Sequence, residues 1–131
     1  MFVPAVRGIA GAAVATAVLS LAAPPALAHN GDDRVRRGSC SGATDWKVKV
    51  GPEDGRLEFE GEVDSSRSGQ TWRWRLMHNG SLSASGVRTT GGRSGSFEVR
   101  RSTVNSRGTD SFVFRARNTR SGELCVGTVN H

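Results

Sequence analysis

Residues 72–80 read Trp-Arg-Trp-Arg-Leu-Met-His-Asn-Gly, and their pattern is the clearest structural signal in the chain. Large apolar residues occupy every second position from Trp72 to Leu76, and arginines stand between them. Side chains that alternate in this way lie on opposite faces of a β-strand. Asn79-Gly80 then supplies two residues that accept positive φ, as a two-residue hairpin turn requires. The segment therefore predicts a strand that buries its tryptophans, exposes its arginines and enters a hairpin.

The same alternation extends along the chain in both directions, and glycine-rich turns separate the alternating segments. No segment of this region has the 3.6-residue period of a helix. We expect seven short strands, over residues 46–50, 57–63, 72–77, 81–90, 97–100, 112–117 and 123–129. Short strands at near-regular spacing favour an all-β fold, an antiparallel Greek-key sandwich of about seven strands, similar to immunoglobulin or fibronectin-III domains.

Composition limits the class of protein. The chain has 131 residues, which is enough for one domain. It carries 18 basic and 12 acidic residues, a net charge of +6, and only two cysteines. These numbers exclude a multidomain enzyme, a cysteine-based zinc module and a polytopic membrane protein. Sixteen of the basic residues are arginines, a bias that a GC-rich coding sequence explains as well as selection for arginine chemistry does.

The first 28 residues have the features of a secretory signal peptide. Arg7 precedes an apolar run over residues 9–23, and Pro24-Pro25 would end the helix that this run forms. Ala26-Leu27-Ala28 matches a small-x-small cleavage site. The alternative is a membrane anchor, but a run of about 15 residues is shorter than the roughly 20 that span a bilayer. We therefore expect cleavage after residue 28 and no membrane-spanning segment afterwards.

The remaining chain divides into a short tail and a domain. Residues 29–39 are polar and charged without periodicity, and we expect a flexible N-terminal tail there. Residues 40–131 would form the sandwich. We expect the protein that remains after cleavage to be secreted, and association with the cell wall is one possible location for it. Export argues against an intracellular nucleic-acid partner, and the sequence leaves the oligomeric state open.

Two cysteines, Cys40 and Cys125, flank the predicted sandwich. In an oxidising compartment a disulfide between them is the expected state. It would join the start of the first strand to the last strand and protect an edge of the sandwich. Two free thiols or an intermolecular bridge are the alternatives.

Several motifs together resemble a group of small secreted actinobacterial proteins of the immunoglobulin- or fibronectin-like sandwich type. They are Gly38-Ser39-Cys40-Ser41, Trp46-Lys47-Val48-Lys49, Gly55-Arg56-Leu57-Glu58-Phe59-Glu60, Val63-Asp64, Gly69-Gln70-Thr71-Trp72-Arg73, Gly95-Ser96-Phe97-Glu98-Val99-Arg100-Arg101 and Gly122-Glu123-Leu124-Cys125. The resemblance spans most of the chain after the predicted signal peptide. It implies the fold and export, and it implies no activity.

Four arginines form the candidate binding site. In a sandwich of this strand order the strands over 72–77 and 112–117 are neighbours, so Arg73, Arg75, Arg115 and Arg117 would share one outer face. Like charges on neighbouring strands reduce stability, so such a cluster indicates an anionic partner. Cell-wall phosphate polymers, lipid headgroups, acidic polysaccharide and extracellular nucleic acid are candidates. The alternative is a solvated face that is arginine-rich only because the whole chain is.

The outer face of the opposite sheet would carry charges of both signs. Glu58, Glu60 and Glu62 alternate with apolar residues, and an antiparallel first strand would place Lys47 and Lys49 against them. A lysine-paired ladder explains these glutamates better than a pair of catalytic carboxylates does. No nucleophile motif accompanies them, so we expect no enzymatic activity and no cofactor.

Three histidines and one serine-rich loop are the candidates for metal binding. After cleavage, the amine and imidazole of His29 could chelate copper, with a third nitrogen from His78 or His131. No further copper motif is present, and His78 is expected at the surface end of its strand. The segment Asp64-Ser65-Ser66-Arg67-Ser68-Gly69 has the spacing of half a calcium loop but supplies a single carboxylate. A serine-rich turn is therefore the better interpretation.

The sequence thus predicts a secreted, non-catalytic binding module that engages an anionic extracellular or envelope partner through its arginines. The alternative is a secreted inhibitor or protein-interaction module that inserts a loop, either Asp64 to Gly69 or Gly91 to Gly95, into the cleft of an extracellular protein. A copper carrier built on His29 is the third hypothesis.

Overall fold

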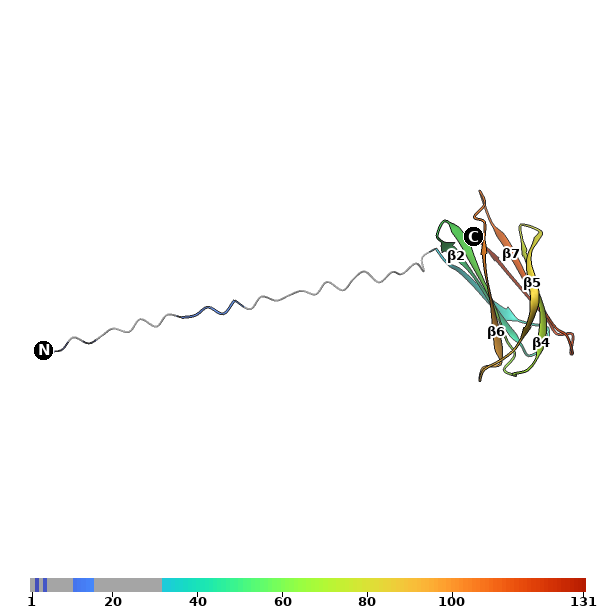
Figure 1. Cartoon of the computed structure of the whole chain (residues 1–131), viewed down its shortest axis with the longest axis horizontal. Helices are drawn as coiled ribbons and strands as arrows, with labels where there is room; N and C mark the ends of the chain where they lie inside the picture. Colours follow the sequence, from blue (N-terminus) through green and yellow to red (C-terminus); the bar gives the residue numbers. More distant parts are fainter. Residues whose placement is uncertain (1, 3, 5–10, 16–31) are drawn as a thin grey trace.

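The computed structural model describes residues 2, 4, 11–15 and 32–131. Within them the chain forms eight strands and no helix (Figure 1). Their bounds are β1 Arg34–Ser39, β2 Asp45–Glu53, β3 Arg56–Asp64, β4 Thr71–His78, β5 Ser81–Thr89, β6 Ser96–Thr103, β7 Ser111–Asn118 and β8 Leu124–Asn130. All seven strands predicted from the sequence are present. The signal peptide predicted over 1–28 lies largely outside the described residues, and the part of the chain described holds no helix long and apolar enough to cross a membrane.

The strands form two four-stranded sheets packed as a sandwich (Figure 1). One sheet has the order β1-β2-β3-β6 and the other β5-β4-β7-β8, and every neighbouring pair is antiparallel. The fourth of the seven predicted strands is β5, and it pairs with β4. In a constant-type immunoglobulin domain the fourth strand instead pairs with the fifth strand, in the other sheet. The predicted all-β sandwich is therefore confirmed, and β5 belongs to the same sheet as β4.

Strand β1 corrects the prediction of a flexible tail over residues 29–39 for its part from residue 34 to residue 39, while residues 29–31 lie outside the described residues. Arg34 to Ser39 pair with β2 in continuous register, from Arg34 opposite Val50 to Ser39 opposite Asp45. The prediction was wrong because backbone pairing at a sheet edge needs no apolar side chains, and charged residues are typical of protected edges. Glycine at position 38 allows β1 to pass close to the Trp46 ring, because a Cβ at this position would lie 2.5 Å from that ring.

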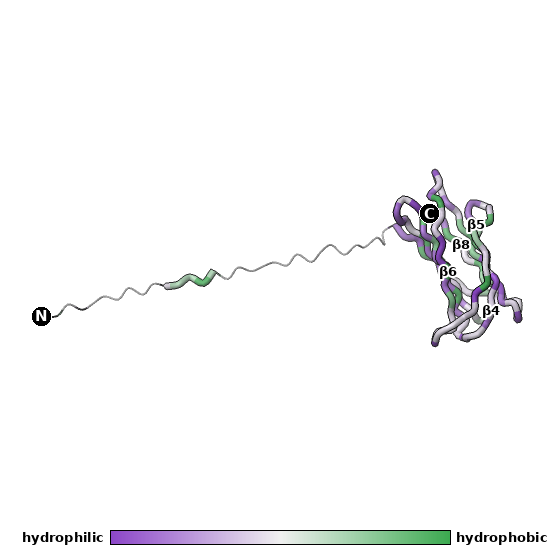
Figure 2. The backbone as a smooth tube through the Cα atoms, in the orientation of Figure 1, coloured by the Kyte–Doolittle hydropathy of each residue, from purple (hydrophilic) through white to green (hydrophobic). Residues whose placement is uncertain are grey.

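The core lies between the two sheets. Figure 2 shows hydrophobic and hydrophilic stretches interspersed along the strands. Trp72 is completely buried and Trp74 is 3 % exposed, as the alternation predicts. Phe59 contacts both Phe112 and Phe114, with ring centroids 5.6 and 5.8 Å apart, and so links the two sheets. Apolar side chains of six strands, β2, β3, β4, β6, β7 and β8, complete the core. Burial of these side chains is the main source of stability for a domain of this size.

The predicted disulfide between Cys40 and Cys125 is confirmed. It joins the connection after β1 to β8, and therefore links the two sheets along one side of the sandwich. Hydrogen bonds lie beside it: Thr44 Oγ1 donates to Glu123 Oε1 at 2.6 Å, and the backbone N–H of Ser41 donates to the Leu124 carbonyl. In the chain-entropy model, closing a loop of this length contributes about 4 kcal/mol to folding.

Candidate functional site

The four predicted arginines lie together on the outer face of the β5-β4-β7-β8 sheet. In the register of β4 and β7, Arg73 lies directly opposite Arg117, and Arg75 lies directly opposite Arg115. All four side chains are exposed, because the tryptophans and phenylalanines between them turn into the core. We call these four residues the arginine face. Directly opposite Cβ atoms in a sheet are about 5 Å apart, so the four side chains leave the sheet as two close pairs.

Nothing on its own sheet neutralises the arginine face. None of the strands β4, β5, β7 and β8 contains an aspartate or a glutamate. Across the part of the chain that the structure describes, none of the four arginines forms an ion pair. Their neighbours on the edge strands are small or aliphatic, with Val87 opposite Arg73 and Val126 opposite Arg115. The face therefore carries four positive charges without internal compensation.

The outer face of the β1-β2-β3-β6 sheet is arranged differently. As predicted, Lys47 lies opposite Glu62 and Lys49 lies opposite Glu60. Arg100, on the edge strand β6, is the cation shared by a cluster of glutamates on this face. Its guanidinium lies 2.7 Å from Glu98, 3.3 Å from Glu60 and 3.9 Å from Glu58. Charges of both signs thus meet on this sheet.

Carboxylates are in local excess at one corner of that sheet. A hydrogen bond with Glu53, then partial burial and the charge of Glu53, raise the pKa of Glu58 to about 7. Asp33 and Asp54 lie in the same shallow depression as Glu53 and Glu58. This corner of the β1-β2-β3-β6 sheet is therefore locally acidic, whereas the arginine face is basic.

The arginine face carries no aromatic side chain. Trp72 and Trp74 point into the core from the same strand that presents Arg73 and Arg75. Trp74 also contacts an arginine, but it is Arg101 from β6, whose guanidinium lies 5.2 Å from the ring centroid. Bases and sugar rings are held mainly by stacking on exposed rings, so the face has no platform for either.

Two adjoining hollows open beside the arginine face. The first has a volume of about 300 Å³ and is lined by Arg73, Arg117 and Thr119. The second, of about 420 Å³, also contains Thr119 and includes Arg67 and Arg120. Sequence reasoning missed Arg67 and Arg120 because each lies in a turn, and only the tertiary fold brings those two turns together.

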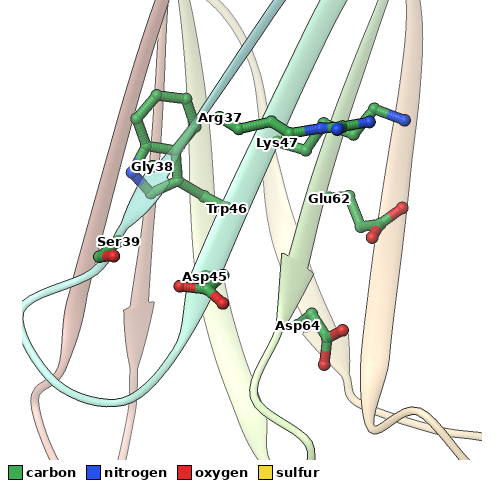
Figure 3. Close-up of a pocket in the computed structure, with 8 residues that line it drawn as sticks. All are labelled: Arg37, Gly38, Ser39, Asp45, Trp46, Lys47, Glu62 and Asp64. Atoms are coloured by element: carbon green, nitrogen blue, oxygen red, sulfur yellow. The ribbon is translucent and has the colours of Figure 1, made fainter.

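A further hollow, of about 490 Å³, lies on the other sheet beside Trp46 (Figure 3). Figure 3 shows the Trp46 ring projecting to the side away from Glu62 and Asp64. Arg37 and Lys47 line the hollow together with the acidic residues. With both signs of charge around it, this hollow has no electrostatic preference for an anion.

The histidines are placed differently from the prediction. His78, expected at the surface, has a side chain only 13 % exposed, and its Nε2 lies 2.6 Å from the Asp110 carboxylate. Its ring stacks on Phe112 at 4.5 Å. Burial opposes ionisation of Asp110, but hydrogen bonds from His78 and Ser106 outweigh it and hold the pKa of Asp110 below its ordinary value. The pair ties the end of β4 to the segment before β7.

Residues proposed for metal binding are not brought together in the described part of the chain. His29 lies outside the described residues. His131 contacts the Asp32 carbonyl through Nε2 at 2.9 Å, and His78 is held by Asp110. Within the described ranges there is no group of three histidine, cysteine, aspartate or glutamate residues that could hold a metal ion. In the Asp64–Gly69 loop the Asp64 carboxylate accepts a hydrogen bond from the Ser66 N–H, as in an ordinary turn.

Comparison with protein-family models, with curated proteins and with solved structures finds no match for this chain.

Proposed function

We propose that the protein is a secreted, non-catalytic binding module that engages an anionic extracellular or cell-envelope partner through the arginine face. The observation that carries the proposal is the pairing of Arg73 with Arg117 and of Arg75 with Arg115 on a sheet whose strands contain no carboxylate. On the opposite sheet, in contrast, carboxylates of Glu60 and Glu98 lie beside Arg100.

The arrangement is unfavourable for folding alone. Like charges directly opposite on neighbouring strands each cost a few tenths of a kcal/mol, up to about 1 kcal/mol. An anionic partner would convert this repulsion into attraction. Guanidinium groups also bind phosphate and carboxylate oxygens through two parallel hydrogen bonds, which a lysine cannot do. The chain has lysines only at positions 47 and 49, both on the other sheet.

The prediction of export supports the choice of an extracellular partner. The predicted signal peptide over 1–28 and the disulfide between Cys40 and Cys125 are both typical of secreted proteins. A basic protein released at the cell surface meets envelope polymers and headgroups that carry negative charge. Its charge would then raise the rate and strength of association with them.

Co-sedimentation with purified cell-wall sacculi tests the proposal at about 20 mM and about 500 mM salt, where screening differs strongly. We expect the protein to bind at low salt and to be released at high salt. The test variant changes Arg73, Arg75, Arg115 and Arg117 to glutamine. The matched control changes Arg34, Arg36, Arg37 and Arg107 to glutamine, because these exposed arginines lie elsewhere. Equal binding by the two variants would contradict the proposal.

One observation favours a second candidate, a protein-interaction or inhibitor module. The two loops named in the sequence analysis are bonded to each other: the Ser65 N–H donates to the Gly95 carbonyl at 3.0 Å, and Ser68 Oγ donates to the Gly92 carbonyl at 2.6 Å. Loops fixed in this way lose little entropy on binding a partner. Replacing both loops by glycine-serine linkers that keep Arg67 should abolish capture of an extracellular protein if this candidate is correct, and should leave sacculus binding unchanged.

A further inference from the structure

We infer that the arginine face is one half of a longer basic track, and that its ligand is a linear polymer with a phosphate on each repeat. The other half is the hollow that contains Arg67 and Arg120. The inference rests on the proposed function and deepens it, since it names the chemistry of the anion and two residues that lie outside the arginine face.

The track begins with evenly spaced rows across β4 and β7. Arg75 and Arg115 form the first row, and Arg73 and Arg117 form the second. Two residues after Arg117, and one beyond the end of β7, is Thr119, whose N–H and Oγ1 both donate to the Thr71 carbonyl, at 3.0 and 3.1 Å. Rows two residues apart in a strand are separated by about 7 Å. Thr119 therefore lies about 13 Å from the first row, at the end of the sheet.

The side chain of Arg117 connects the face to the turn after β7. One of its guanidinium nitrogens lies 3.6 Å from the position that a Cβ on Gly122 would occupy. Arg117 lines the first hollow, and Thr119 lines both hollows. Thr119 therefore lies between the two hollows, so that a chain lying along the arginine face would reach the second hollow past this residue.

The second hollow is basic and rigid. It is lined by Arg67, Gly69, Gln70, Thr71, Asn118, Thr119, Arg120 and Ser121, none of which is acidic. The Asn118 side chain accepts hydrogen bonds from the N–H groups of Arg120 and Ser121, which fixes the turn that carries Arg120. The Arg67 carbonyl accepts a hydrogen bond of 2.6 Å from Thr90 Oγ1, which fixes the opposite wall. The track thus presents six arginines and no carboxylate.

The chemistry of the track favours phosphate in a flexible chain. It has no exposed aromatic ring, so it offers no stacking for bases or sugars. Its charges are repeated in rows, so it suits an anion that repeats along a chain better than one isolated charge. The forked guanidinium groups match phosphate oxygens bidentately. The hydroxyl of Ser121, whose oxygen accepts a hydrogen bond from the Glu123 N–H, adds one neutral hydrogen-bond donor at the end of the track.

Binding of two inorganic probes by the purified protein tests the inference. Tripolyphosphate is short enough to occupy the arginine face alone, whereas long-chain polyphosphate can occupy the whole track. The variant R67Q/R120Q removes the far end, and R75Q/R115Q removes the first row of the face. The control R36Q/R107Q removes the same charge from exposed positions outside the track. Isothermal titration at several salt concentrations gives the affinity and its salt dependence.

We expect the wild-type protein to bind long-chain polyphosphate more tightly than tripolyphosphate, because a chain that spans the track makes more contacts. R67Q/R120Q should lose roughly tenfold in affinity for the long chain, about threefold for each lost contact, and should retain its affinity for tripolyphosphate. The slope of log affinity against log salt should fall by about 1.5 for the long chain. R75Q/R115Q should lose affinity for both probes.

Other outcomes separate the inference from the proposed function. If R67Q/R120Q binds the long chain as R36Q/R107Q does, the track ends at the arginine face and the inference is wrong, while the proposed function stands. If the protein binds phosphatidylglycerol vesicles but not long-chain polyphosphate, the partner is a lipid surface and the inference is again wrong. If no anionic probe binds, both the inference and the proposed function fail.

Discussion

The two outer faces of the sandwich use similar alternating strands but arrange their charges in opposite ways. On the β1-β2-β3-β6 sheet Arg100 contacts three glutamates, and Lys49 lies 3.4 Å from Asp33. On the β5-β4-β7-β8 sheet Arg75 faces Arg115, and the strands contain no carboxylate. An arginine-rich composition explains how many arginines the chain has. It does not explain why one face pairs them and the other leaves them unpaired.

The largest effect should appear within strand β4, between its inner and outer residues. Trp72→Ala removes a completely buried side chain and should lower the free energy of unfolding by about 3–5 kcal/mol. Arg73→Ala, one position away, removes an exposed charge from a repulsive pair and should leave stability the same or slightly higher. Denaturant unfolding of both variants measures the difference. Equal destabilisation would mean that the two faces of β4 are assigned incorrectly.

A single charge reversal should make the arginine face resemble the opposite sheet. Arg115→Glu places a carboxylate directly opposite Arg75, so stability should rise by up to about 1 kcal/mol. The same variant should bind sacculi more weakly at low salt than the wild-type protein does. Thermal unfolding and co-sedimentation give the two results.

The control for this reversal is Arg36→Glu, which makes the same change of charge on the exposed edge strand β1. It should leave binding close to that of the wild-type protein. If the control and Arg115→Glu weaken binding equally, then net charge rather than the arginine face governs association.

The smallest effect concerns the acidic corner of the other sheet. Neighbouring Glu53 and partial burial raise the pKa of Glu58 from 4.5 to about 7 in the folded protein. The folded state therefore holds this proton more tightly than the unfolded state does, so the contribution of Glu58 to stability is present below pH 4.5 and is lost as the pH rises toward 7. Glu58→Gln should flatten the decline in stability over this range. An unchanged pH profile, measured by denaturant unfolding, would contradict the assignment.

Most of the fold could be predicted from the sequence because it depends on local alternation. The arginine face followed from the alternation in residues 72–77 and 112–117, together with a strand order that makes these segments neighbours. The disulfide followed from there being two cysteines and a predicted export signal. In each case one pattern in the chain was sufficient to indicate the structure.

Features that depend on contacts between irregular segments could not be predicted. Strand β1 has no apolar periodicity, and it is held by backbone pairing and by the ring of Trp46 over Gly38. The contact of His78 with Asp110 joins a strand end to a loop 32 positions away. The hollow between Arg67 and Arg120 arises where two turns meet at the end of the sandwich.

The central claim is that the arginine face, and not basic charge in general, holds the anionic partner. Side-chain Nε–Hε resonances of the arginines, followed by NMR during titration with soluble wall polymer at low salt, test this claim most directly. We predict that the resonances of Arg73, Arg75, Arg115 and Arg117 shift together and return at high salt, while those of Arg36 and Arg107 stay in place. Shifts of Arg36 and Arg107 equal to those of the four, or no shift of the four during binding, would contradict the account.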